Sequence, residues 1–136
     1  MESMKTAVNA YQTVQVDAAV LGASPHELIA KLLNKAIDST VEAKRYMADG
    51  DIANKTAHIK IAVAIISDGL RSSLDMEAGG ELAERLDALY EYMSQRLLKA
   101  HIDNDITILD EIVTLLREIK SGWDGIKDQV STSWSK

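Results

Sequence analysis

The sequence predicts an all-α protein: an antiparallel up-down-up-down four-helix bundle with a short N-terminal amphipathic cap segment. The 136 residues contain one proline and seven glycines, so few positions allow the backbone to turn sharply. Aromatic residues make up 4% of the chain and phenylalanine is absent, whereas strands favour aromatic residues. Apolar residues recur every three or four positions over long stretches, which is the period of a helix buried on one face.

Length and composition predict one cytoplasmic domain spanning residues 1–136. We expect a cap segment at about residues 5–16, the bundle at about 24–124 and a frayed tail at about 125–136. The chain has no cysteine, which excludes disulfides and thiolate chemistry and removes any need for an oxidising compartment. The longest aliphatic run, Ile61 to Ile66, is far shorter than the roughly 20 residues of a membrane span. No apolar block typical of a secretory signal follows Met1, so we expect no membrane insertion.

The charge balance argues against nucleic acid as the main partner. Lysine and arginine number 15 against 21 aspartate and glutamate residues, so the net charge is −6. Phosphate backbones are bound by basic surfaces. Acidic residues alternate with basic ones along the predicted helices, which is typical of the solvated face of a bundle.

The first two helices are predicted to form a tight hairpin. Ser24 can cap the first helix, Pro25 suits its first position, and Glu27 completes a capping box. Gly50 is placed to end this helix, and Asp51 can cap the second at once. Apolar faces are expected at Leu28, Ile29, Leu32, Leu33, Ala36 and Ile37 of the first helix, and at Ile52, Ile59, Val63, Ile66, Leu70 and Leu74 of the second.

The third and fourth helices follow two further breaks in the pattern. Gly79-Gly80 is expected to separate the second helix from the third, and residues 101–105 to separate the third from the fourth. Their inner faces are predicted at Leu82, Leu86, Leu89, Met93, Leu97 and Ala100, then at Leu109, Ile112, Leu116, Ile119 and Trp123.

The cap segment is a short amphipathic piece before the bundle. Ala7, Tyr11 and Val14 share one helical face. Helices this short are marginal in water, so the segment must dock on something or stay loose.

The three histidines are the first residues to consider for catalysis or metal binding. His26 is expected near solvent at the start of the first helix, His58 on the second helix and His101 at the end of the third. None belongs to a Glu-x-x-His pair of the kind that binds metal in ferritin-like bundles. We therefore expect no catalytic residue, no metal site and no cofactor.

His58 also raises the alternative of a phosphotransfer bundle. Domains of that kind resemble a His-x-x-Lys-Gly pattern, in which the glycine leaves the imidazole open to attack. Here the residues are His58-Ile59-Lys60-Ile61, with the lysine one position early and no glycine after it. Phosphoryl transfer onto His58 would distinguish this alternative.

The most informative feature is apolar surface beyond what a bundle core needs. Ile61 and Ile65 lie roughly opposite the core stripe of the second helix, and Tyr92 and Leu98 lie off the stripe of the third. One interpretation is a deeply buried second helix that touches two neighbours. Another is an exposed groove for an amphipathic partner helix, which the cap segment covers when empty. A third is that the same surface makes a weak homodimer.

Several stretches, in this order and spacing, resemble the flagellar secretion chaperone FliS family. The resemblance covers roughly residues 5 to 125. The matching pieces are Ala10 to Val16, Ala23 to Ile29, Ile65-Ile66, Leu70 to Asp75, Gly79 to Leu82, Leu86, Leu89 to Met93, Leu97, Ala100, Asn104-Asp105 and Trp123.

The resemblance implies a cytosolic export chaperone. Such a protein binds the disordered C-terminal segment of flagellin as separated helices along the bundle, and so prevents premature polymerisation. The loaded complex then docks on an export-gate membrane protein, and some relatives also have an anti-sigma factor as a client. The contact residues implied by this resemblance are Tyr11, Val14, Leu28, Leu32, Ile61, Ile65, Leu86, Tyr90 and Met93.

Overall fold

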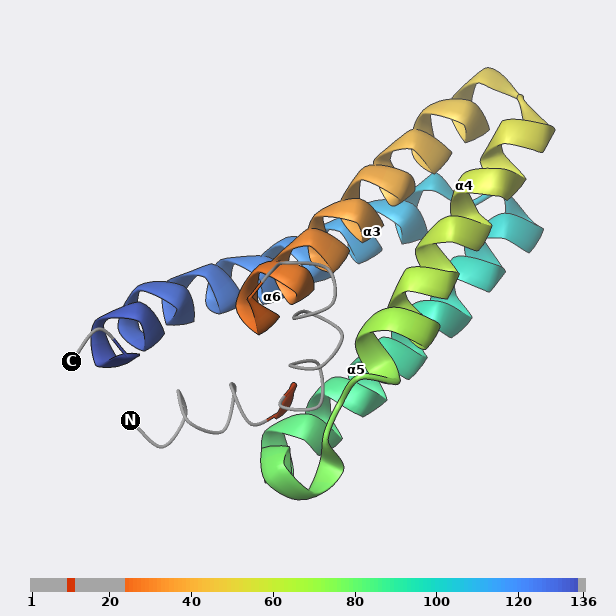
Figure 1. The fold of residues 1–136 in the computed structure, drawn as a ribbon. Coiled ribbons are helices and arrows are strands. Elements are labelled where there is room, and N and C mark those ends of the chain that lie inside the picture. Colours follow the sequence, from red (N-terminus) through yellow and green to blue (C-terminus); the bar gives the residue numbers. More distant parts are fainter. Residues whose placement is uncertain (1–9, 12–23, 135–136) are drawn as a thin grey trace.

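Four long helices pack as a bundle in the computed structural model, which describes residues 10–11 and 24–134, with the backbone alone from residue 126 on (Figure 1). No strand occurs among these residues, so the predicted all-α class is confirmed. The elements are α3 (Pro25–Asp49), α4 (Ile52–Ala64), the π-helix η1 (Ile65–Arg71), α5 (Met76–Asp103) and α6 (Ile106–Trp134).

The α3–α4 hairpin forms as its capping residues predict. The Ser24 hydroxyl accepts a hydrogen bond from the backbone N–H of Glu27 at 3.1 Å, and Pro25 opens α3. Gly50 ends α3 with a left-handed φ of 75°, a conformation that glycine adopts without steric cost. Asp51 then caps α4 by accepting from the N–H of Asn54 at 3.1 Å.

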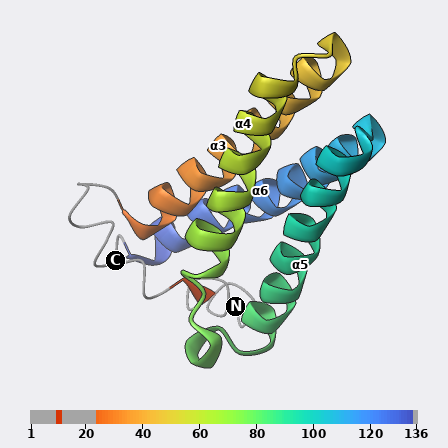
Figure 2. The same ribbon diagram turned by 90° about the vertical axis from the view of Figure 1, so that its right-hand side faces the viewer.

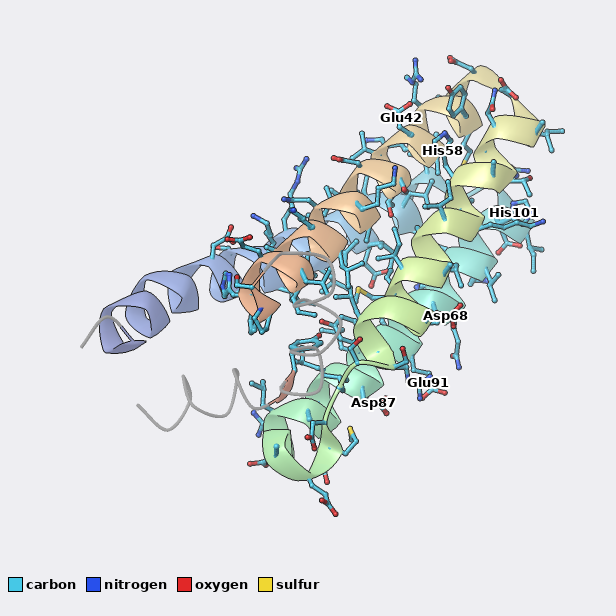
Figure 3. The ribbon with its side chains drawn as sticks, viewed as in Figure 1. Glu42, His58, Asp68, Asp87, Glu91 and His101 are labelled. Carbon is cyan, nitrogen blue, oxygen red and sulfur yellow. The ribbon has the colours of Figure 1, made fainter. Side chains whose placement is uncertain are left out.

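The second helix is not uniform, because α4 passes into η1. Its core residues Ile66 and Leu70 are fully buried and lie four positions apart. A stripe with that spacing drifts around an α-helix of 3.6 residues per turn, and a wider π-turn keeps it facing the core. The sequence pattern does not predict this change. Arg71 ties η1 to α5, since its guanidinium lies 2.7 Å from Asp87 and 3.4 Å from Glu91 (Figure 3).

The predicted place of Ile52 in the core is wrong. Ile52 is the first residue of α4, at the end of the bundle, and is 70% exposed. Lys55 is buried instead, at 3% exposure. Its ammonium donates to the His101 carbonyl at 3.2 Å and to Asn104 Oδ1 at 2.6 Å, so it caps the C-terminal end of α5.

The third helix begins earlier than predicted, at Met76. The Asp75 carboxylate caps it by accepting from the N–H groups of Glu77 and Ala78. The glycine pair therefore lies inside α5, where Gly80 has a φ of 54° and interrupts the regular helix.

The fourth helix is longer than predicted. The sequence predicts fraying from about Gly125, but α6 continues to Trp134. A single glycine costs a helix only about 1 kcal/mol relative to alanine, which is too little to end it.

The helices enclose one continuous apolar core. Figure 2 shows α3 and α5 on opposite sides of the bundle, with α4 and α6 between them. The large side chains that are fully buried there come from every helix: Ile29, Leu33, Ile59, Ile66, Leu70, Tyr90, Met93, Leu97, Leu109, Ile112 and Leu116.

Candidate functional site

An apolar cavity of about 190 Å³ opens between α3, α5 and α6. Aliphatic and aromatic side chains form most of its wall, and Glu118 is the charged residue at its edge. The lining residues are Tyr11, Ile29, Leu33, Leu82, Leu86, Tyr90, Glu118, Ile119, Gly122 and Trp123.

Tyr11 completes the wall of this cavity from outside the four helices. It is only 3% exposed, its hydroxyl is hydrogen-bonded to that of Tyr90, and its ring meets Trp123 edge-on at 5.5 Å. The carbonyl of Ala10 accepts from the N–H of Asp75 at 2.7 Å. Residues 10 and 11 thus lie against the first turn of α5 (Figure 2). A peptide segment distant in sequence is therefore held by a backbone hydrogen bond, a hydroxyl pair and an aromatic contact.

The two tyrosines are neutral hydrogen-bonding groups near pH 7. Burial raises the pKa of Tyr90 to about 12. Burial, and then the neighbouring Tyr90, raises the pKa of Tyr11 well above its ordinary value. Both rings therefore stay protonated, and one hydroxyl donates to the other. Neither group is poised to exchange a proton near neutral pH.

Trp123 of α6 and His26 at the start of α3 contact each other beside Tyr11 through hydrogen bonds and ring stacking. The indole N–H of Trp123 donates to the His26 carbonyl at 3.0 Å, and His26 Nε2 lies 2.7 Å from the Trp123 carbonyl, to which it donates. The two rings stack at 4.6 Å with an interplanar angle of 5°. His26 is half-buried near the start of α3, because its ring turns back onto α6.

Three of the predicted contact residues meet at the cavity: Tyr11, Leu86 and Tyr90. Met93, one turn beyond Tyr90, is fully buried in the core. Val14 lies outside the described residues.

The other four predicted contacts lie on α3, α4 and η1. Leu28 and Leu32 are half-buried on α3, and Leu32 lies beside Gly69 of η1. Ile65 is half-buried, and Ile61 is 37% exposed. None of these four lines the cavity that holds Tyr11.

Sequence analysis missed the role of Trp123 in this site. It assigns Trp123 to the inner face of the fourth helix, and likewise places Ile29, Leu82 and Ile119 in core stripes. These residues lie where the core opens at the end of the bundle, so one face of each contributes to the cavity wall. A tryptophan at the end of a helical stripe, with an amphipathic tyrosine segment still to place, is the signal that could have indicated this.

A second cavity of about 260 Å³ lies between α4 and α5. Its apolar wall comes from Ile59, Val63, Ala64 and Leu98, and Leu98 is 50% exposed. Polar side chains make up the rest of the lining: Thr56, Lys60, Asp68 and His101. Ile61 and Ile65 do not line it, so the opening flanks α4 on a different side from the one the apolar pattern indicates.

The three histidines of the described residues lie apart from one another. His58 is half-buried and stacks on Tyr46 at 5.3 Å, while His101 lines the second cavity (Figure 3). The part of the chain that the structure describes contains no group of three or more histidine, aspartate and glutamate residues placed to hold a metal ion. In the same part, no helix is both long and apolar enough to cross a membrane.

The fold and the site together define a four-helix bundle with an apolar cavity between three of its helices, against which residues 10 and 11 of the same chain pack. The family model described as flagellar protein FliS matches residues 7–130 of this chain. The chain therefore belongs to the FliS family, and the resemblance stated from the sequence is confirmed.

Relatives with curated names share most of their length with this chain. It is 47% identical over 126 residues to flagellar secretion chaperone FliSB of Pseudomonas aeruginosa, covering 93% of this chain and 98% of the relative. It is 39% identical over 129 residues to flagellar secretion chaperone FliS of Salmonella typhimurium, covering 95% and 96%. Flagellar secretion chaperone FliS of Bacillus subtilis is 29% identical over 114 residues, covering 84% of this chain and 80% of the relative.

Proposed function

We propose that this protein is a flagellar export chaperone that binds the C-terminal segment of flagellin, prevents its premature polymerisation and delivers it to the export gate. The curated relatives carry the name flagellar secretion chaperone, and the FliS family is a class of chaperones rather than enzymes. The observation that carries the proposal is the apolar cavity whose wall Tyr11 completes, where residues 10 and 11 already pack against the bundle through Tyr90 and Trp123.

The chemistry of the cavity suits an amphipathic segment. Its wall is mostly apolar, and the Tyr90 hydroxyl, which now pairs with that of Tyr11, supplies a hydrogen-bonding group. Apolar anchors with a few placed polar groups are typical of a helix-in-groove complex. A flagellin tail that folds on binding would cover a large surface at limited affinity, which favours release at the gate.

The client would take the place of Tyr11. While Tyr11 contacts Tyr90 and Trp123, part of the cavity wall is unavailable to any other segment. An incoming apolar side chain of the client would contact the same wall, including Leu86. Tyr11 would be displaced and become exposed to solvent. This exchange offsets part of the binding free energy, since the segment that leaves is itself well packed.

The remaining predicted contacts extend this proposal along the bundle. Leu28, Leu32, Ile61 and Ile65 would receive a second helix of the client on the α3 and α4 side, with Val14 beside Tyr11. Met93 would act from the core by supporting Tyr90.

The other partners follow from the same role. The loaded complex would dock on an export-gate membrane protein from the cytoplasm, and an anti-sigma factor would be a further client. A weak homodimer through the apolar surface of α4 is tested by the mass of the free protein in dilute solution.

Calorimetric titration with the C-terminal segment of flagellin from the same cell tests the proposal. We expect saturation near one to one, a negative heat-capacity change and a gain in helix measured by circular dichroism. A folded monomer that gives no heat and no gain in helix would contradict it.

A further inference from the structure

Gly79 lies unusually close to the backbone of residue 10. A Cβ atom at Gly79 would lie 2.7 Å from Ala10 Cα and 3.0 Å from Ala10 Cβ, closer than packed carbon atoms approach. Gly79 does not have a positive φ, whereas its neighbour Gly80 does. The requirement for glycine at position 79 is therefore one of space and not of backbone conformation.

The first turn of α5 forms the contact surface on which Ala10 packs; this surface, made by Asp75 and Gly79, is called the seat of Ala10. The Asp75 N–H donates to the Ala10 carbonyl, and one turn later Gly79 leaves the hollow in which Ala10 is fully buried. Small residues on both sides allow the two backbones to meet. Tyr11, the next residue, can then reach Tyr90 and Trp123.

We propose that Gly79 is the positioning residue that sets how often residues 10 and 11 occupy the cavity, and thereby the affinity of the cavity for its client. The second half of this proposal rests on the proposed function. One methyl group added on either side of the contact separates Ala10 from its seat and withdraws Tyr11 from the cavity. A client side chain that enters near Leu86 does not need this contact, so it is not excluded by the same change.

The expected effect on affinity follows from competition for one site. The apparent affinity of a ligand is reduced by the fraction of molecules able to bind it. If the protein's own segment occupies the cavity about nine-tenths of the time, then removing that segment raises client affinity about tenfold.

The first measurement reports whether residues 10 and 11 are packed against α5 when no client is present. Trp134→Phe leaves Trp123 as the single tryptophan, and its emission and quenching by acrylamide report the contact with Tyr11. In this background we expect Gly79→Ala to make Trp123 more accessible. Gly125→Ala is the matched control, because a Cβ there meets nothing within 4 Å.

A second variant, Ala10→Leu, tests the same contact without changing the packing inside α5. A Cβ at Gly79 would also lie 2.6 Å from Ala83 Cβ, so Gly79→Ala changes packing inside the helix as well. Ala10→Leu adds bulk to the same contact from outside the four helices. We expect it to expose Trp123 as Gly79→Ala does, and it decides the question if Gly79→Ala fails to fold.

The second measurement is titration of the same variants with the C-terminal segment of flagellin. We expect Gly79→Ala and Ala10→Leu to bind about tenfold more tightly, and Gly125→Ala to bind as the parent does. Unchanged quenching of Trp123 in both variants would overturn the proposal. Exposed Trp123 with unchanged or weaker client binding would overturn it too.

A failure of the proposed function gives a different pattern. In that case no variant binds flagellin, and neither does the parent protein. Exposure of Trp123 in Gly79→Ala and Ala10→Leu would still support the role of Gly79 in seating residues 10 and 11.

Discussion

The two cavities of the bundle differ in what they offer a ligand. The cavity between α4 and α5 is the larger, at about 260 Å³ against 190 Å³, yet it is the smaller one whose wall includes Tyr11 from outside the four helices. The wall of the smaller cavity is almost entirely aliphatic and aromatic, and Tyr11 contributes to it, whereas Thr56, Lys60, Asp68 and His101 make half of the lining of the larger one polar. The two cavities therefore differ in the polarity of the surface that they offer, and volume does not capture that difference.

The largest expected effect is the loss of stability when the Tyr90 ring is removed from the wall of the smaller cavity. Tyr90→Ala deletes a fully buried aromatic side chain and should lower the free energy of unfolding by about 3–5 kcal/mol. Leu98→Ala, at the half-exposed wall of the second cavity, should cost less than about 1 kcal/mol. Urea unfolding followed by circular dichroism measures both, and equal losses would show that the two cavities are not distinct in packing.

The second-largest effect is expected from a charge placed in each cavity wall, which should show at which of the two cavities flagellin binds. Leu86→Asp places a carboxylate in the apolar wall and should weaken flagellin binding by roughly 3 kcal/mol, about a hundredfold. Leu98→Asp makes the same chemical change on the same helix and should leave binding within about twofold. Calorimetry measures both affinities, after thermal melts confirm that each variant is folded. Equal weakening by Leu98→Asp would place the client in the α4–α5 cavity as well.

Alkaline pH should lower the free energy of unfolding through Tyr90 in the wall of the smaller cavity. The lining of the larger cavity contains no tyrosine and should not contribute in this way. The folded-state pKa of Tyr90 is about 12 and its ordinary value is 10.0, so folding favours the neutral ring. Its contribution is fully present below pH 10 and is lost between pH 10 and 12, at about 1.4 kcal/mol for each pH unit. Urea unfolding across this range should show the loss, with a shallower slope in Tyr90→Phe. An identical slope in that variant would assign the loss to other groups.

The smallest effect is expected at the far end of the bundle. Lys55→Met removes the ammonium that caps α5 and should lower the free energy of unfolding by about 1–2 kcal/mol. Lys60→Met, at an exposed lysine on the same helix, should be close to neutral. Neither change should alter flagellin binding, because neither residue lines the cavity that holds Tyr11. A loss of binding in Lys55→Met alone would show that the two ends of the bundle are coupled.

Local signals predict most of the fold because they act over a few residues. Ser24, Gly50 and Asp51 each fix a helix end through a neighbour three positions away, Pro25 does so through its own fixed φ, and the structure places these ends as predicted. The start of α5 was misplaced because Asp75 caps it and Gly80 merely kinks it. Two glycines in a row resemble a break, and the pattern alone does not distinguish a break from a kink.

The site was only partly predictable because its contacts join distant positions. The apolar pattern identifies Tyr11 as amphipathic, but nothing local pairs it with Tyr90 or places Trp123 beside it. Lys55 shows the same limit, since a lysine between apolar residues gives no sign that the end of α5 will lie over it. Gly79 is the clearest case, because its role depends on the backbone of residue 10.

The hydrogen bond between the two tyrosines also has a consequence for the order of folding. It joins positions 79 residues apart, whereas Gly50 and Asp51 let α3 and α4 pair through local contacts. Local contacts close short loops and form early, while distant ones wait for the chain between them. Tyr11 is synthesised before Tyr90 and Trp123 exist, so it can reach its place only after α5 and α6 have been made. The α3–α4 hairpin, in contrast, can form while the rest of the chain is still being synthesised.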